Sequence, residues 1–269
     1  MSKAFGAAFA IAQVREHLDW LSASCRDLEL QDFVSPEVLG GNWQSRVKEY
    51  RDLLHDYPGR YGMHGPFRGL PMDSEDPEIR KVVQARLEQG LKIAEALGAS
   101  HMVVHSPMHP WLERNLEMNE SNEDALFDRF HATLKDAVKQ AENSGCTLML
   151  ENTRDIVPHR QVELMESFGS AAIRISVDVG HAFCMHVMDA APPPDYWLRH
   201  AGPMLGHVHL QDTDGYADRH WLPGEGLIRW QSVLASLGKH EGVRKIIEVK
   251  DKTGVKKTAA WLEHLCQDA

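Results

Sequence analysis

Short apolar runs alternate with longer amphipathic segments along the whole chain. Segments 76–97 and 121–144 have helical spacing of apolar residues, and each is followed directly by a glycine, Gly98 or Gly145, which is typical of a helix end. The apolar runs that we interpret as strands are AFGAAFAIA, DLELQDF, RYGMHGP, HMVVHSP, CTLMLENT, IRISVDVG, LGHVHLQD and KIIEVKD. Strands that alternate with helices pair in parallel, because each crossover returns the chain to the same end of the sheet.

Eight such units in a chain of 269 residues match the size of a closed barrel. We therefore expect an α/β fold: a single (β/α)8 TIM barrel over residues 1–269, without a linker that would divide it. APPPDYW at 191–197 is interpreted as a loop that enters a helix. The alternative, an open doubly wound sheet, normally carries a glycine-rich phosphate-binding turn after its first strand, and the sequence has none there.

Polar residues end six consecutive predicted strands. They are His64, His105, Glu151, Asp178, His209 and Glu248. In such barrels the carboxyl ends of the strands form the catalytic face, so all six side chains are expected at one rim. A single histidine or carboxylate at a strand end is usually a hydrogen-bonded structural residue. Six in register, each after apolar residues, favour a metal site at the C-terminal face, where a shared cation would offset the cost of burying charge.

Three further residues extend the predicted metal site. His181 lies one helical turn beyond Asp178, and Asp218 and His220 flank Arg219, a spacing that places both side chains on one face of an extended segment. In contrast, Asp212 and Asp214 in DTDG are typical turn formers, and His207 shares the face of His209 but lies deeper in the barrel. We leave Asp212, Asp214 and His207 outside the metal shell.

Charge and composition narrow the range of partners. A formal net charge of −10 argues against broad attraction to nucleic acid or to an anionic membrane. The four cysteines are far apart and predict neither a zinc ribbon nor a disulfide scaffold, but reduced and mostly buried thiols. The apolar run at 4–12 is a poor signal peptide and too short to cross a bilayer, so we expect a cytoplasmic protein. The oligomeric state stays open, a homo-oligomer included.

The motifs HGPF, VVHSP, LENT, VDVGHAF, HVHLQD, DRHWLPGEG and IIEVKD, in this order on successive strands, resemble the xylose isomerase-like barrel superfamily. That superfamily includes sugar isomerases and epimerases and the endonuclease IV family. The resemblance covers about residues 60–250 and is weak before residue 60.

The epimerase branch implies one divalent ion, often manganese, at Glu151, Asp178, His209 and Glu248. Glu151 and Glu248 would then act as acid and base on opposite faces of the substrate carbon, and His181 would contact a substrate oxygen. The endonuclease IV branch implies three zinc ions: His64 and His105 hold the first, Glu151 bridges it to a second at Asp178, His209 and Glu248, and His181, Asp218 and His220 hold the third. The sequence retains all nine residues.

The sequence thus predicts a divalent-metal enzyme with one to three Mn or Zn ions. The favoured function is isomerisation or epimerisation of a small sugar or sugar-like hydroxy-carbonyl compound, or of a sugar phosphate, through an enediolate. The loops 31–44 and 66–76 hold few cations that could follow a nucleic-acid backbone, which speaks against an endonuclease. The alternative is a trinuclear phosphoester hydrolase, and a third is a non-catalytic metal-binding scaffold, which a blocked rim would favour. Arg68, His109, Trp111, Arg154 and Lys250 are candidate substrate contacts or plain surface residues.

Overall fold

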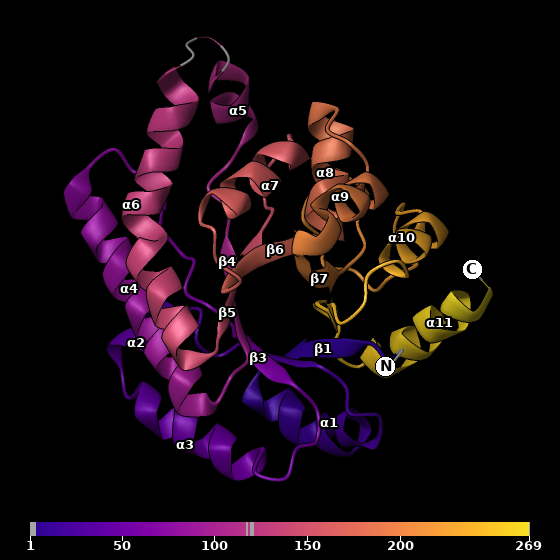
Figure 1. Ribbon diagram of the computed structural model, residues 1–269. Coiled ribbons are helices and arrows are strands. Elements are labelled where there is room, and N and C mark those ends of the chain that lie inside the picture. The colour runs from indigo at the N-terminus through magenta and orange to yellow at the C-terminus, as the bar shows by residue number, and fades with distance from the viewer. Residues whose placement is uncertain (1–3, 117, 119–120, 269) are drawn as a thin grey trace.

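A computed structural model describes residues 4–116, 118 and 121–268, and over these residues the strands close into a parallel barrel in the order β1 to β8 (Figure 1). The strands are β1 Gly6–Phe9, β2 Leu28–Leu30, β3 Tyr61–His64, β4 His101–His105, β5 Thr147–Glu151, β6 Ile173–Asp178, β7 Leu205–Leu210 and β8 Arg244–Ile247. Seven of the eight apolar runs contain one strand each, and the eighth overlaps β8, which begins one residue earlier at Arg244. The predicted (β/α)8 barrel is therefore confirmed.

Helices surround the barrel and follow its strands. They are α1 Ile11–Ala23, α2 Pro36–Gly40, α3 Trp43–Leu53, α4 Pro77–Leu97, α5 Pro110–Leu116, α6 Ser121–Ser144, α7 Pro158–Ser167, α8 Val179–Asp189, α9 Pro194–Ala201, the 3-10 turn η1 Gly202–Met204, α10 Trp230–Leu237 and α11 Val255–Asp268. Both helices expected from the pattern are present, and the APPPDYW loop leads into α9 as expected. Within the described residues, every helix is too short or too polar to span a lipid bilayer.

Local chemistry explains where α4 begins and ends. The side chain of Asp76 accepts a hydrogen bond from the backbone N–H of Glu78, and Pro77 occupies the first helical position, where its missing N–H costs nothing. Gly98 ends the helix with φ 76°, a left-handed conformation that glycine adopts without strain. Val83, Leu87 and Leu91 on its inner face are fully buried.

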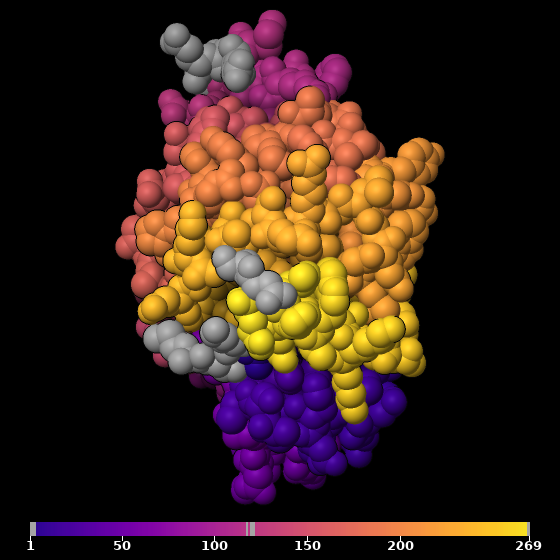
Figure 2. All heavy atoms as spheres, turned by 90° about the vertical axis from the view of Figure 1, so that its right-hand side faces the viewer, coloured from indigo at the N-terminus to yellow at the C-terminus, as the bar shows by residue number. Residues whose placement is uncertain are grey.

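The two ends of the chain close the barrel together. Ala7 of β1 is paired with Ile247 of β8, and Arg26 donates a 2.6 Å hydrogen bond to Glu263 of α11. Figure 2 shows the yellow C-terminal helix lying against the indigo N-terminal segment. Because the strands run in one direction, their carboxyl ends gather at a single rim.

The four cysteines form no disulfide in the part of the chain that the structure describes. Cys146 and Cys184 are buried, whereas Cys25 is exposed, so the expectation of mostly buried thiols was right for only some of them.

Candidate metal centre

The strands deliver the six predicted residues to the same rim. His64, His105, Glu151 and Asp178 are the last residues of β3, β4, β5 and β6, and His209 is the next to last of β7. Glu248 lies one residue beyond β8, where its backbone N–H still donates to the carbonyl of Leu210 on the neighbouring strand. The register of the sheet places His105 beside Glu151 and Asp178 beside His209.

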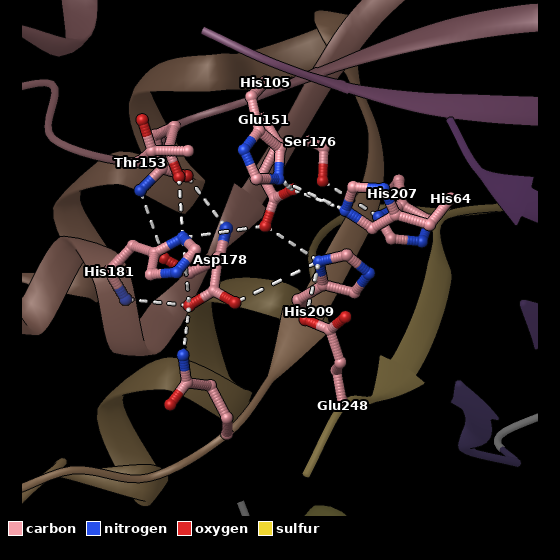
Figure 3. A network of polar contacts seen from close by, with 12 residues as sticks. His64, His105, Glu151, Thr153, Ser176, Asp178, His181, His207, His209 and Glu248 are labelled. Atoms are coloured by element: carbon pink, nitrogen blue, oxygen red, sulfur yellow. Dashed lines mark hydrogen bonds and ion pairs between the residues drawn. The ribbon is translucent and has the colours of Figure 1, made fainter. Parts of the chain in front are cut away.

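Glu151, Asp178, His209 and Glu248 form the first group, in which one ligand atom from each residue lies within 4.8 Å of the others. His209 Nδ1 is 2.9 Å from a Glu151 oxygen, 3.4 Å from a Glu248 oxygen and 4.0 Å from an Asp178 oxygen (Figure 3). Burial alone would lower the pKa of His209, but the carboxylates of Glu248, Glu29 and Glu151 raise it well above its ordinary value. The group therefore concentrates negative charge around one imidazole.

His64 and His105 form the second group with Glu151. Their Nε2 atoms are 3.2 Å apart and lie 3.6 and 3.4 Å from the second oxygen of Glu151. His64 Nδ1–H donates to the carbonyl of Gly65, so that in the neutral imidazole Nε2 is the nitrogen that can bind a metal ion. Burial lowers the pKa of His105 to about 3, so this imidazole is neutral, the form that binds metals. The ring of Phe67 stacks on His105 at 4.2 Å.

Glu151 lies between these two groups. One of its oxygens faces His209, and the other faces His64 and His105. The residue is only 1% exposed, and its Oε2 is buried without a hydrogen-bond partner, as is Oδ2 of Asp178. Unpaired carboxylate oxygens are costly inside a protein, and a cation is the partner that such a donor set accepts. The residues present therefore fit divalent metal ions.

His181, Asp218 and His220 form the third group. One oxygen of Asp218 lies 3.5 Å from His181 Nε2 and 3.1 Å from His220 Nε2. His181 is in the first turn of α8, where its backbone N–H donates to the side chain of Asp178, and its Nδ1–H donates to the carbonyl of Asn152. Burial of Asp178 raises its pKa to about 6 despite nearby His181.

The route by which Asp218 and His220 meet differs from the prediction. The segment is not extended, because His220 has φ 51°, in the left-handed region. Its backbone N–H donates to Gln211 and its Nδ1–H donates to the carbonyl of Glu248, which together turn the ring back toward Asp218. The two side chains converge as expected, but tertiary hydrogen bonds bring them together.

Asp212 fixes the loop that carries Asp218 and His220. Its buried carboxylate accepts hydrogen bonds from the backbone N–H groups of Thr213, Gly224 and Ile228 and from the indole of Trp230. Asp212 thus forms the turn expected from DTDG and also anchors the rest of the loop. Asp214 is paired with Arg219 at the surface, and His207 points inward toward Ser176. His207 also belongs to a fourth candidate group, with Glu29 and His209.

We expect Asp212→Ala to lower the free energy of unfolding by about 3 kcal/mol, because several buried donors would lose their acceptor. Denaturant unfolding would measure the change. Asp214→Ala on the same loop is the control and should change the free energy by less than about 1 kcal/mol, since its ion pair with Arg219 is partly exposed to solvent. Equal effects of the two substitutions would contradict the anchoring role.

Several residues of the site were not predicted from the sequence. Asn152 donates to the carbonyl of Asp178 and accepts from its backbone N–H, and Gln211 donates to both Asp178 and Asp218. Both directly follow a strand, a position that the strand-end rule could have included. Glu29 is a fully buried carboxylate between two leucines of β2. A charged residue inside an apolar strand is unusual unless it is paired, so its position in the sequence could have indicated a residue of the site.

A hollow of about 640 Å³ opens beside the second and third groups, so the rim is accessible. Its lining includes the apolar residues Phe67, Leu70 and Pro71 and also His105, His181 and Asp218. Among the described residues that line it, Arg154 is the single arginine or lysine. Of the proposed substrate contacts, His109 and Arg154 line the hollow, whereas Arg68, Trp111 and Lys250 do not.

The model of the xylose isomerase-like TIM barrel matches residues 29–265. The chain belongs to this family. An uncharacterised protein of Methanocaldococcus jannaschii is 28% identical over 77% of this chain and 69% of its own. A probable endonuclease 4 of Symbiobacterium thermophilum is 26% identical over 81% and 82%, and a fructoselysine 3-epimerase of Escherichia coli O157:H7 is 25% identical over 42% of each chain.

Two solved structures have the same fold as this chain. A Thermus thermophilus protein soaked with ZnCl2 is 27% identical, with a TM-score of 0.75 over 100% of this chain and 99% of that one. A D-tagatose 3-epimerase-like protein is 22% identical, with a TM-score of 0.75 over 98% of both chains. The family likeness found on the strand-end motifs is confirmed, and the family contains sugar epimerases as well as endonucleases.

Proposed function

We propose that the chain is a divalent-metal enzyme that holds up to three ions and hydrolyses phosphoester bonds in small molecules. The position of Glu151 supports this most directly, because its two oxygens face two different ligand groups. A carboxylate placed in this way can bridge two cations. Paired or clustered cations suit the in-line displacement of an alcohol oxygen from phosphorus by water, because they can stabilise both the attacking and the leaving oxygen.

Nine residues would hold the ions. His64, His105 and Glu151 would hold one; Glu151, Asp178, His209 and Glu248 a second; His181, Asp218 and His220 a third. Imidazoles mixed with carboxylates suit zinc, and manganese accepts the same donors. Bound divalent ions supply Lewis acidity that stabilises the charge developing on phosphoryl oxygens.

The chain itself selects a small substrate. The lining of the hollow beside the ligand groups includes the apolar side chains of Phe67 and Leu70 and the cation of Arg154, which can pair with an anionic group of the substrate. The net charge of −10 and the single lining arginine do not suit a duplex backbone. A sugar phosphate or another small phosphoester fits this arrangement. The similarity to a probable endonuclease 4 supports the reaction class.

Isomerisation or epimerisation of a small sugar, which the sequence favoured, is the second candidate. The group of Glu151, Asp178, His209 and Glu248 is a complete site for one ion on its own, and the similarity to a fructoselysine 3-epimerase favours it. That reaction needs Glu151 to exchange a proton with the substrate. Because Glu151 is 1% exposed and its Oε2 faces His64 and His105, we place this function second.

Replacing His220 by alanine tests the third ligand group. We expect His220→Ala to lose one of three bound ions and to lower kcat/KM on p-nitrophenyl phosphate and on sugar phosphates roughly 10²-fold or more, because a ligand is removed outright. Metal analysis of the purified protein and initial rates would measure both. His159→Ala, at an exposed histidine of α7, should change neither.

Metal analysis and activity assays of the unmodified protein distinguish the two functions. A single bound ion, together with exchange of a carbon-bound proton of a ketose with solvent deuterium and no phosphoester cleavage, would overturn hydrolysis in favour of isomerisation.

A further inference from the structure

Glu29 is a carboxylate buried inside the barrel, below the ligand groups at the rim. It is the middle residue of β2 and has no exposed surface. Gln31 lies two positions further, so both side chains project to the same face of the strand. Neither residue belongs to the nine proposed ligands.

Each oxygen of Glu29 faces a different histidine of β7. Oε1 lies 3.0 Å from His209 Nε2, and Oε2 lies 3.1 Å from His207 Nε2. His207 is in turn held by Ser176, whose hydroxyl is 2.9 Å from His207 Nδ1. The carboxylate thus lies between two fully buried imidazoles: it is hydrogen-bonded to His209 and within ion-pair distance of His207.

The contact with Glu29 determines which nitrogen of His209 faces the rim. With the Nε2–H of His209 donating to Glu29, the opposite nitrogen, Nδ1, faces Glu151 at 2.9 Å and Glu248 at 3.4 Å. A carboxylate behind an imidazole sets its tautomer and ring orientation and increases its strength as a ligand.

Gln31 extends the same support to a second ligand. Its side-chain NH2 donates to Glu29 at 2.8 Å and to Glu248 at 3.0 Å. Strand β2 and the residue that follows it, neither of which supplies a proposed ligand, therefore contact two of the four residues of the first group.

We propose that Glu29 is a positioning residue for that group: it orients His209 directly and Glu248 through Gln31, so that both present ligand atoms to one cation. The proposal rests on the metal site of the proposed function, but it does not depend on whether the enzyme hydrolyses or isomerises. Its readout is metal binding rather than turnover.

Titration of metal-free protein with Zn²⁺ and with Co²⁺ tests the proposal. We expect Glu29→Gln to weaken binding at the first group roughly 10- to 100-fold and to change the visible absorption of bound Co²⁺. Glu113→Gln is the matched control: it is also a buried carboxylate, but its oxygens accept from the backbone of Ile156 and Val157, away from the ligands. Its affinity and Co²⁺ spectrum should equal those of the parent.

Glu29→Asp is the second variant, in case Glu29→Gln does not fold. It keeps the charge but is one methylene too short to reach both histidines, so we expect a smaller loss of affinity and a partial return of the Co²⁺ spectrum. Affinities within threefold of the parent in the folded variants would overturn the positioning role while leaving the proposed function intact. Absence of metal binding by the parent protein would overturn both.

Discussion

Replacing Glu151 by glutamine is expected to lower kcat/KM for phosphoester hydrolysis roughly 10³-fold and to remove at least one bound ion. The amide is neutral, so it cannot offer an anionic oxygen to each of the two groups that meet at Glu151. The loss of several kcal/mol of Lewis-acid stabilisation, at tenfold per 1.4 kcal/mol, gives the expected factor.

Metal content and steady-state rates measured on the same sample would check this expectation. Glu113→Gln again serves as the control, because burial and the neighbouring Asp155 raise the pKa of Glu113 to about 8, so glutamine resembles its protonated form. Should Glu151→Gln keep the full set of ions and a rate within tenfold of the parent, a bridging role for Glu151 would be wrong.

Removal of the metal ions by a chelator should lower the melting temperature by roughly 10 °C. Ions that bind the folded chain at about a thousand times their dissociation constant stabilise it by about 4 kcal/mol. In a protein of this size each kcal/mol corresponds to about 2–4 °C. Without ions, Glu151 and Asp178 would each retain a buried oxygen with no hydrogen-bond partner, which destabilises the fold.

Differential scanning calorimetry of chelated, untreated and Zn²⁺-restored protein would measure the shift. Restoration by Zn²⁺ or Mn²⁺, but not by Na⁺, should recover the original melting temperature. An unchanged melting temperature after complete removal of the ions would show that the carboxylates at the rim are satisfied without them.

The barrel and the rim residues could be predicted because both depend on local pattern. An apolar strand followed by a polar residue, as in MVVH ending at His105 or LMLE ending at Glu151, identifies both the strand and its outward end. Parallel topology then brings such ends together without any knowledge of the intervening loops. The nine residues therefore converge as the sequence predicted, in three adjoining groups.

The remaining features depend on contacts between distant segments. Glu29 and His209 are 180 positions apart and meet inside the barrel, so the strand-end rule could not find their contact. His220 reaches Asp218 only because Gln211 and the Glu248 carbonyl impose a left-handed backbone. The placement of both oxygens of Glu151 also depends on tertiary contacts, and it is the observation on which we propose hydrolysis ahead of the isomerisation that the sequence favoured.

Pairing of β1 with β8 has a consequence for how the protein would acquire the proposed metal ions. The first group needs residues from 151 to 248, and its support at Glu29 comes from the opposite end of the sequence. Contacts of such long sequence separation form late in folding. An incomplete chain emerging from the ribosome would thus bind metal ions only weakly, through histidines and carboxylates that are still far apart. Tight binding of the ions would begin only after β8 has paired with β1.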